Sequence, residues 1–275
     1  MKKINKELLK KYESKARFIR KKIVKMHTFS KSSHIGSSLS VTDILVALYF
    51  HILKIDTQNY KDKNRDRLIL SKGHAASALY ATLAIRGFFP VEVLDGYCID
   101  AGTLPGHSTI NCVPAVEVST GSLGHGLSMG IGMALAAKYD NSNYKTFVIL
   151  SDGECNEGSV WEAAMFASHH KLDNLIAIID YNKLQAFGRN KEVINLEPFN
   201  NKWRSFGWET EEIDGHNLSK IIQTLQKVPF KETKPSVVIA HTIKGKGVSF
   251  MENQLAWHYK SPNQQELELA MEELD

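Results

Sequence analysis

The sequence feature that most constrains the fold is a strand–helix–strand unit around residues 151–187. An apolar run rich in β-branched residues, 146–150, predicts a buried strand. A helical segment follows at about 158–170, and a second apolar run at 174–179 predicts a second buried strand. Two strands joined in this way lie parallel and side by side, which is the geometry of an α/β fold.

Polar residues follow both predicted strands, with Asp152 after the first and Asn182 after the second. The carboxyl ends of neighbouring parallel strands meet at the edge where open α/β sheets bind ligands. The oxygens of Asp152 and Asn182, with a backbone carbonyl from the following turn, at Leu184, form a hard-oxygen set suited to Mg²⁺ or Ca²⁺. The alternative is that Asp152 only caps the next helix and Asn182 only makes a turn.

Strand and helix signals alternate along much of the chain, which predicts a doubly wound, mostly parallel sheet with helices on both faces. Further strands are predicted at 67–70, 209–213 and 236–240, and further helices at 75–86 and 218–226. Asn5 predicts the cap of a first helix, and Ser40 with Asp43 predicts a capping box for the next. Residues 1–275 are expected to form one domain, since no repeat or low-complexity tract divides them.

The composition excludes several classes of protein. With 43% hydrophobic and 23% charged residues, and a net charge of only +4, the chain is an ordinary globular protein without the basic excess of a nucleic-acid binder. Its basic start, residues 1–26, lacks the unbroken apolar core of a secretion signal or membrane span. Three cysteines without paired spacing favour a reducing, cytoplasmic location. Cys155 could be a nucleophile beside Asp152, but a small buried thiol is the commoner role.

Several basic residues lie in predicted loops beside glycines or strand ends: His34, His74, His107, Lys244 and His258. A loop histidine alone is more often incidental than functional. The loop at 241–247, HTIKGKG, is either a solvated basic loop or a glycine-spaced anion site. Before it, Gly126, Gly130 and Ala134 are spaced along one side of a predicted helix and would permit close packing.

Five stretches of the chain resemble transketolases, in the order of that family. Residues 151–187 look like its diphosphate-binding motif, which opens with Gly-Asp-Gly and closes near an Asn about thirty residues later. The other matching blocks are Ser33-His34-Ile35-Gly36, residues 70–74, residues 105–107, residues 119–126, and the loop at 241–247 with His258. The sequence departs from the family pattern at Ile35, Ser122, His125 and Ser151.

The resemblance implies a thiamine diphosphate site with Mg²⁺ or Ca²⁺. The residues that it implies as catalytic are His34, His74, His107 and His258, whose imidazoles can relay protons near neutral pH. Those that it implies as cofactor ligands are His74, Gly121, Ser122, Leu123, Asp152, Gly153, Glu157, Asn182, Lys244 and His258. Those that it implies as metal ligands are Asp152, Asn182 and Leu184.

The resemblance covers residues 15–258, which correspond to only the first domain of a transketolase. In that family a second domain holds the aminopyrimidine of the cofactor. The resemblance therefore implies an N-terminal subunit that is active only with a separate C-terminal subunit and transfers a two-carbon ketol unit from a ketose phosphate to an aldose phosphate. It also places Glu157 and Glu162 near a subunit interface, and implies two copies of each subunit, with this chain pairing through helices near 126–137.

Two alternatives to this function stay open. One is a subunit of another thiamine-diphosphate enzyme, either a transketolase for an unusual sugar or a decarboxylase. The other is a non-catalytic binding module that retains the fold. The presence of Asp152, Asn182 and the histidine set weighs against the binding module.

Overall fold

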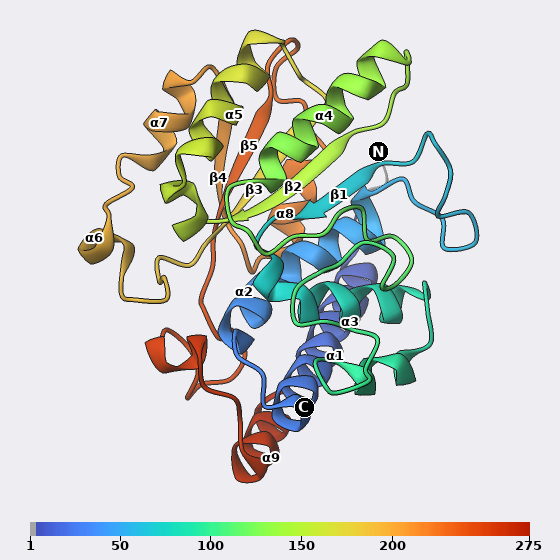
Figure 1. Ribbon diagram of the computed structural model, residues 1–275, viewed down its shortest axis with the longest axis vertical. Coiled ribbons are helices and arrows are strands. Elements are labelled where there is room, and N and C mark those ends of the chain that lie inside the picture. The colour runs from blue at the N-terminus through green and yellow to red at the C-terminus, as the bar shows by residue number, and fades with distance from the viewer. Residues whose placement is uncertain (1–3) are drawn as a thin grey trace.

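A five-stranded parallel sheet forms the centre of the computed structural model, which describes residues 4–275 (Figure 1). Its strands are β1 (Arg67–Leu70), β2 (Thr146–Ser151), β3 (Leu175–Tyr181), β4 (Glu209–Asp214) and β5 (Ser236–His241). They lie in the order β1-β2-β3-β5-β4, and each neighbouring pair is parallel. The predicted α/β fold with a parallel sheet is therefore confirmed.

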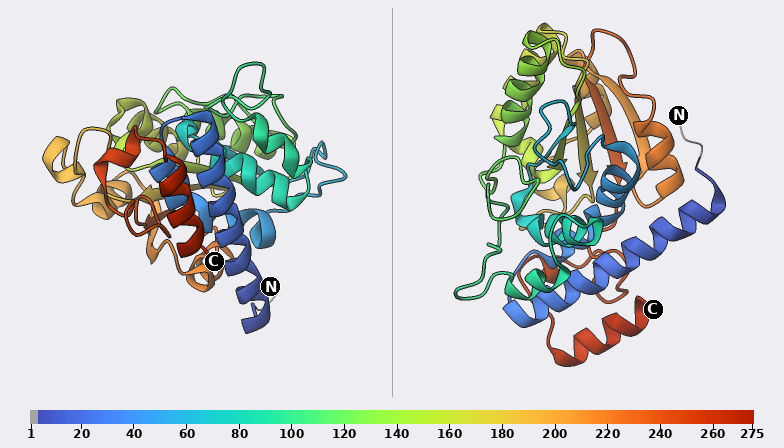
Figure 2. Two further views of the ribbon diagram at one scale, coloured as in Figure 1. Left: turned by 90° about the horizontal axis from the view of Figure 1, so that it is seen from below. Right: turned by 90° about the vertical axis from the view of Figure 1, so that its right-hand side faces the viewer.

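Helices cover both faces of this sheet, as Figures 1 and 2 show. They are α1 (Lys6–Ser30), α2 (Ile35–Ala47), α3 (Ala76–Arg86), α4 (Gly126–Tyr139), α5 (Gly158–His169), α6 (Asn190–Val193), α7 (Phe199–Ser205), α8 (Leu218–Leu225) and α9 (Gln264–Glu273). One core joins α4, α5 and α7 to strand residues such as Val148 and Ile179, and the other joins α1, α2, α3 and α8 to alternate residues such as Ile149 and Ile178. Helices α1 and α9 lie side by side beneath the sheet (Figure 2).

Central and edge strands differ in burial. All residues of β2 and β3 are buried, because helices cover both faces of these strands, and their sequences are almost continuously apolar. Strand β4 lies at the edge of the sheet and exposes Glu211 and Glu212. The core of the sheet therefore lies at β2 and β3, the two strands of the predicted central unit.

The small residues of α4 face the sheet. A Cβ added to Gly126 would lie 2.2 Å from Ser71 Oγ, and one added to Gly130 would lie 2.5 Å from Val148 Cγ2. The close packing predicted for this stripe is therefore used between helix and strands. Pairing of two copies of the chain through this region stays a prediction.

The start of α2 differs from the prediction. The capping box expected at Ser40 and Asp43 is wrong, because α2 begins at Ile35 and both side chains lie buried within the helix. Their polar atoms bond distant groups: Ser40 Oγ donates to Asp180, and Asp43 accepts from Arg20. By contrast, the predicted cap at Asn5 is confirmed, since its side chain accepts the N–H of Leu8.

One helical stretch, Ile35–Ile52, could span a membrane by length and composition alone. It comprises α2 and the π-helical turn Leu48–Ile52, with a mean hydropathy of 1.5. Because 83% of it is buried inside the fold, it has the character of a core helix. Of the basic start considered in the sequence, residues 1–3 lie outside the described part of the chain.

Candidate active site

A cavity of about 450 Å³ opens at the carboxyl ends of the central strands. The residues that line it include His34, Ser37, His74, His107, Gly121, Leu123, Asp152, Gly153, Glu154, Glu157, Asn182, Leu184, Gln185, Phe187, Lys244 and His258. The structure thus brings together all the predicted site residues except Ser122, which is exposed and does not line the cavity. These residues come from six separate segments of the chain.

The ends of β2 and β3 place Asp152 and Asn182 on one side of the cavity. The two strands are in register with Ser151 opposite Asp180, so Asp152 follows directly after one strand and Asn182 closes the other. Asp152 accepts the N–H groups of Gly153 and Lys183, and Asn182 Oδ1 accepts the N–H of Leu184 at 3.1 Å. These bonds fix both side chains before any ligand is present.

The donor set fits a hard divalent cation. Asp152 is only 2% exposed, and burial followed by the nearby charge of Asp180 raises the pKa of its carboxyl group, which a cation would counteract. With Asn182 and the carbonyl of Leu184 it offers oxygens alone, the chemistry of Mg²⁺ or Ca²⁺ sites. Residues 4–275 contain no group of three His, Cys, Asp or Glu side chains suited to a metal, as expected for a set with one carboxylate.

Four histidines gather on another side of the cavity. The ring centroid of His34 lies 5.2 Å from that of His74, 6.0 Å from that of His107 and 4.9 Å from that of His258. His34 begins α2 with a left-handed φ of 75°, and its N–H donates to the carbonyl of His258 at 2.7 Å. The unusual backbone of His34 is thus held by the segment that carries another histidine of the cluster.

Burial keeps three of these imidazoles neutral. Burial first, and then neighbouring positive charges, lower the pKa of His34 to about 4 and that of His258 to about 3. The same causes hold the pKa of His74 well below its ordinary value. At neutral pH these rings can therefore accept a hydrogen bond or a proton from a substrate hydroxyl.

Glycines let the loop of residues 119–124 lie tightly against the end of β1. A Cβ on Gly73 would lie 2.7 Å from the backbone nitrogen of Gly121. Gly121 itself has a φ of 144°, and a Cβ there would lie 3.1 Å from His107 Cδ2. Side chains at either position would separate this loop from the histidines.

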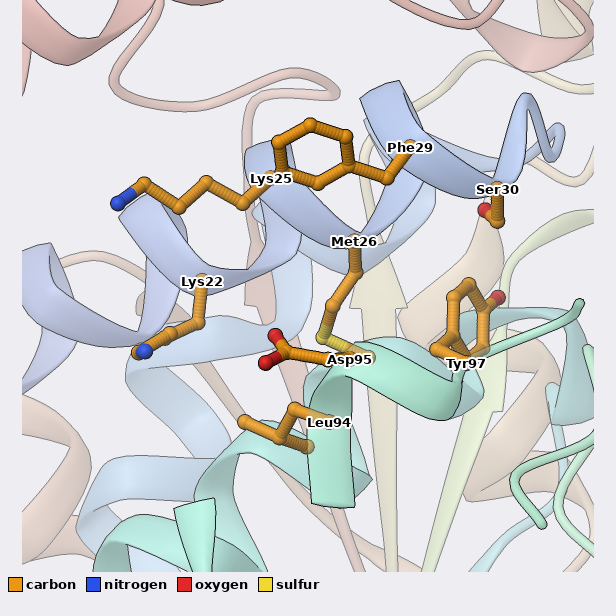
Figure 3. Close-up of a pocket in the computed structure, with 8 residues that line it drawn as sticks. All are labelled: Lys22, Lys25, Met26, Phe29, Ser30, Leu94, Asp95 and Tyr97. Atoms are coloured by element: carbon orange, nitrogen blue, oxygen red, sulfur yellow. The ribbon is translucent and has the colours of Figure 1, made fainter. Parts of the chain in front are cut away.

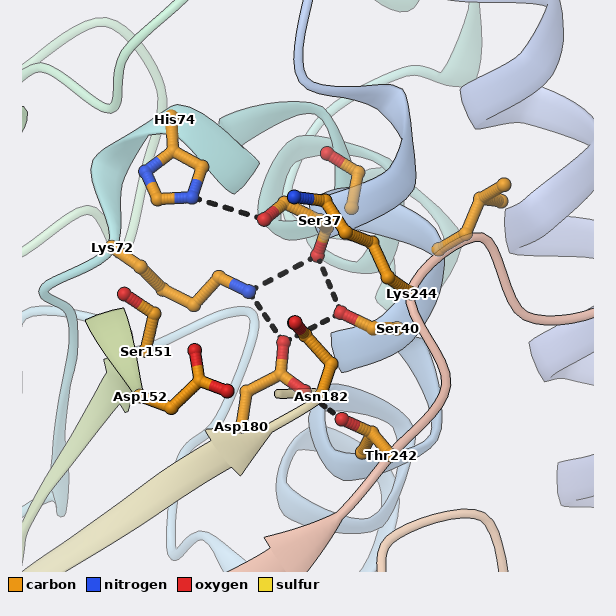
Figure 4. Close-up of polar contacts among 12 residues, drawn as sticks. Ser37, Ser40, Lys72, His74, Ser151, Asp152, Asp180, Asn182, Thr242 and Lys244 are labelled. Carbon is orange, nitrogen blue, oxygen red and sulfur yellow. Dashed lines mark hydrogen bonds and ion pairs between the residues drawn. The ribbon is translucent and has the colours of Figure 1, made fainter. Parts of the chain in front are cut away.

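A buried ion pair between Lys72 and Asp180 underlies the site and is missed by sequence reasoning (Figure 4). Both side chains are fully buried. Lys72 Nζ also donates to the carbonyl of Ser37 at 3.2 Å, and Asp180 accepts from Ser40 and Thr242. The pair therefore ties the ends of β1 and β3 to α2 and to the segment after β5.

Glu154 is a second buried carboxylate that the sequence does not single out. It accepts hydrogen bonds from Ser71 Oγ, from Gly124 N at 2.9 Å and from Ser151 N at 3.2 Å. Burial raises the pKa of its carboxyl group. Its position two residues after Asp152 is a signal in hindsight, although its partners are not predictable from spacing.

Lys244 reaches the cavity from the loop after β5. It is 1% exposed, and its Nζ contacts the carbonyl of Leu184 at 3.0 Å, that of Gln185 at 3.3 Å and His258 Nδ1 at 2.8 Å. Burial first, and then the charge of Lys72, lower its pKa to about 8. Its three contacts are to neutral groups, so the ammonium remains available to an anion in the cavity.

Other candidate features do not form a second site of this kind. Cys155 is 1% exposed and burial raises the pKa of its thiol, which confirms a buried thiol rather than a nucleophile. A separate hollow of about 310 Å³ lies beside α1 (Figure 3). Its lining residues are Lys22, Lys25, Met26, Phe29, Ser30, Leu94, Asp95 and Tyr97. Its lining has one carboxylate and no histidine, so chemistry rather than volume distinguishes the cavity at the strand ends.

Comparison with known proteins gives a consistent result. Residues 11–274 match the family described as "Transketolase, thiamine diphosphate binding domain". One of the two subunits named for an apulose-4-phosphate transketolase, from Phocaeicola vulgatus, is 46% identical over 255 residues, which cover 93% of this chain and 90% of that protein. The 6-deoxy-6-sulfo-D-fructose transketolase subunit SqwG from Clostridium sp. (strain MSTE9) is 45% identical over 242 residues, or 88% of each chain. Transketolase from Leishmania mexicana superposes with a TM-score of 0.89 at 26% identity, over 96% of this chain but only 41% of the other.

Proposed function

This chain belongs to the transketolase family, and on that basis we propose that it is the N-terminal, cofactor-binding subunit of a split transketolase that transfers a two-carbon ketol unit from a ketose phosphate to an aldose phosphate. The observation that carries the proposal is the cavity itself. It joins four imidazoles on one side to Asp152, Asn182 and the Leu184 carbonyl on the other. The first group suits proton transfer at sugar hydroxyls, and the second suits a metal-bound diphosphate.

Each group of residues has a distinct task in this proposal. Bound thiamine diphosphate supplies the carbon nucleophile that such a transfer needs. Asp152, Asn182 and the carbonyl of Leu184 would hold Mg²⁺ or Ca²⁺, and Lys244 would face the diphosphate charge. His34, His74 and His258, neutral at pH 7, would orient substrate hydroxyls and accept or return their protons.

A second subunit is part of the same proposal. The chain spans 41% of the length of the Leishmania mexicana transketolase but 90% of the length of the Phocaeicola vulgatus protein, which is named as one subunit of its enzyme. We expect a C-terminal transketolase subunit to complete the cavity, with two copies of each in the assembly. Glu157 and Glu162 are both exposed, as an interface position requires. A cytoplasmic location, and a role in the pentose phosphate pathway or related carbohydrate metabolism, belong to the proposal too.

One alternative substrate class is favoured by a specific observation. Two of the most similar relatives are named for apulose 4-phosphate and for 6-deoxy-6-sulfo-D-fructose, which are not the usual transketolase sugars. A transketolase for an unusual sugar is therefore the second candidate function. The histidine cluster suits ketol transfer in both cases, so assays need to include several ketose donors.

The experiment that tests the proposal compares the purified chain with and without a C-terminal transketolase subunit. We expect weak thiamine diphosphate binding by calorimetry in Mg²⁺, and no turnover, for the chain alone. Addition of the partner should restore turnover in an assay coupled to glyceraldehyde phosphate formation or to the product of another donor. Appreciable turnover by the chain alone would contradict the split-subunit proposal.

Asp152→Ala should abolish metal-dependent cofactor binding even when the partner is present. The variant removes the one charged oxygen ligand, and hard cations depend strongly on ligand charge. Calorimetry in Mg²⁺ provides the measurement. Asp173→Ala is the matched control, because Asp173 forms an exposed ion pair with Lys138. Wild-type cofactor affinity in Asp152→Ala would identify this residue as a helix cap only.

A further inference from the structure

A buried polar chain outside the cavity runs from α1 to the loop that carries Lys244. Arg20 of α1 pairs with Asp43 of α2 through distances of 2.6 Å (Nη2 to Oδ2) and 3.2 Å (Nη1 to Oδ1). His216, in the turn between β4 and α8, places Nδ1 2.8 Å from the same Oδ2. Its other ring nitrogen, Nε2, lies 2.8 Å from the backbone nitrogen of Ile243, which donates to it. The chain therefore ends one residue before Lys244.

These contacts determine where the proton of His216 lies. A backbone N–H can only donate, so Nε2 of His216 must present its lone pair to Ile243. The proton of the neutral ring is therefore on Nδ1 and is donated to Asp43. Asp43 is 5% exposed and Arg20 is 6% exposed, so the carboxylate that holds the ring is itself fixed by a buried partner. His216 is thus locked in one tautomer and one orientation.

The hydrogen bond to Ile243 acts at a point where the loop has few other anchors. On the far side of Lys244, Gly245 N donates to Gly36 O at 3.0 Å. A Cβ on Gly36 would lie 3.0 Å from Lys244 Cγ, so the lysine stem passes close to α2. The bond to His216 is the corresponding anchor on the β5 side of Lys244. Movement of the Ile243 backbone would therefore displace the lysine stem from this narrow path.

We propose that His216 is a positioning residue for Lys244: by accepting the N–H of Ile243 it fixes the backbone from which the lysine reaches the cavity. Asp43 and Arg20 act one step further away, by holding the imidazole. The effect on cofactor binding rests on the proposed function. The effect on the backbone does not, and is measurable without any ligand.

The first test uses the full wild-type chain. ¹⁵N–¹H spectra of the histidine rings at pH 7.5 should show His216 with a proton on Nδ1 and an unprotonated Nε2. The opposite tautomer, or a doubly protonated ring, would overturn the proposal, because neither can accept from Ile243. This measurement needs no variant, so it stands even if a substitution prevents folding.

The second test uses two substitutions that each keep half of the imidazole's hydrogen bonding. His216→Gln can place an oxygen near the position of Nε2 and so accept from Ile243, whereas His216→Asn can only place a donor near Nδ1 and so keep Asp43. We expect hydrogen exchange of the Ile243 amide to rise about tenfold in the Asn variant, the loss of roughly one hydrogen bond, and to stay within about threefold of wild type in the Gln variant. Equal exchange in the two variants would overturn the proposal.

Cofactor titration provides the functional readout. Thiamine diphosphate affinity in Mg²⁺ should weaken about tenfold in His216→Asn and recover in His216→Gln. His241→Asn is the control, since His241 also pairs with a carboxylate, Glu212, but at an exposed site. Weakening of the control by the same factor would overturn the assignment to His216. If no protein bound the cofactor, wild type included, the proposed function would fail while amide exchange still decided the positioning role.

Discussion

Lys72 and Lys244 are two buried lysines beside the same cavity, and the fold accommodates their charges in opposite ways. Lys72 is fully buried against Asp180, whose remaining oxygen positions are filled by Ser40 and Thr242. Lys244 is almost as buried, yet its ammonium contacts two carbonyls and an imidazole. The first charge is neutralised within the fold. The second is left for a ligand.

The difference separates a group that builds the site from one that serves it. A buried charge with its counter-ion and hydrogen bonds complete has nothing further to bind, and its removal leaves the partner charge exposed to a low dielectric. A buried ammonium among neutral oxygens has a lowered pKa and gains from an incoming anion. Burial alone therefore does not identify a functional lysine. The charge balance around it does.

The largest effect is expected when the Lys72 pair is broken. Lys72→Met leaves the carboxylate of Asp180 buried without its counter-ion, which should cost about 3–5 kcal/mol of the free energy of unfolding. Urea unfolding at pH 7.5 measures the change. The double variant Lys72→Met with Asp180→Leu should recover much of this loss, because an apolar pair leaves no buried charge. A single variant that lost less than about 1 kcal/mol would break the contrast between the two lysines.

The Lys244→Met variant should show the reverse pattern. Loss of three hydrogen bonds to neutral groups is offset by relief of a desolvated charge, so the free energy of unfolding should change by no more than about 1 kcal/mol. Thiamine diphosphate affinity in Mg²⁺ should instead fall roughly 10–100-fold, the equivalent of one charge-assisted hydrogen bond. Calorimetry and urea unfolding on the same preparation measure both quantities. A stability loss as large as that of Lys72→Met, with affinity unchanged, would contradict the assignment.

His27 extends the comparison to a buried base that avoids charge altogether. It is 0% exposed, bonds Ser77 Oγ at 2.8 Å, and burial lowers its pKa to about 4 from an ordinary 6.5. Above pH 6.5 the ring is neutral in both folded and unfolded chains. As the pH falls from 6.5 towards 4, only the unfolded chain takes up the proton, so stability falls by up to about 1.4 kcal/mol per pH unit.

His27→Gln should remove one proton's worth of this slope. Urea unfolding between pH 7 and pH 4.5 compares the variant with the wild type, in which the site histidines add slopes of the same sign. Identical slopes in the two proteins would show that His27 does not remain neutral in the fold.

The sequence was sufficient for the sheet and for the residues on its carboxyl edge. Apolar runs predict β2 and β3, and the geometry of parallel strands then brings Asp152 and Asn182 together without knowledge of any other contact. The resemblance added the histidines and Lys244, all of which line the cavity. Each of these predictions uses information that is local to one segment of about five to thirty residues.

The supporting contacts were not predictable, because each joins residues far apart in the chain. Lys72 and Asp180 are separated by 108 residues, and Asp43 and His216 by 173. The same cause explains the wrong capping box. Ser40 and Asp43 have the residue types of a helix start, but their hydrogen bonds go to Asp180 and Arg20. A local pattern cannot reveal that a polar side chain is already committed elsewhere.

The charged edge of the sheet limits how copies of this chain can associate. A free strand edge invites another chain to add a strand, which is a common route to aggregation. On β4, Glu211 and Glu212 are exposed at that edge, and a second copy would bring the same carboxylates against them. Like charges on facing strands repel. Continuation of the sheet from one molecule into the next is thus disfavoured, and contacts between subunits are left to helices and loops.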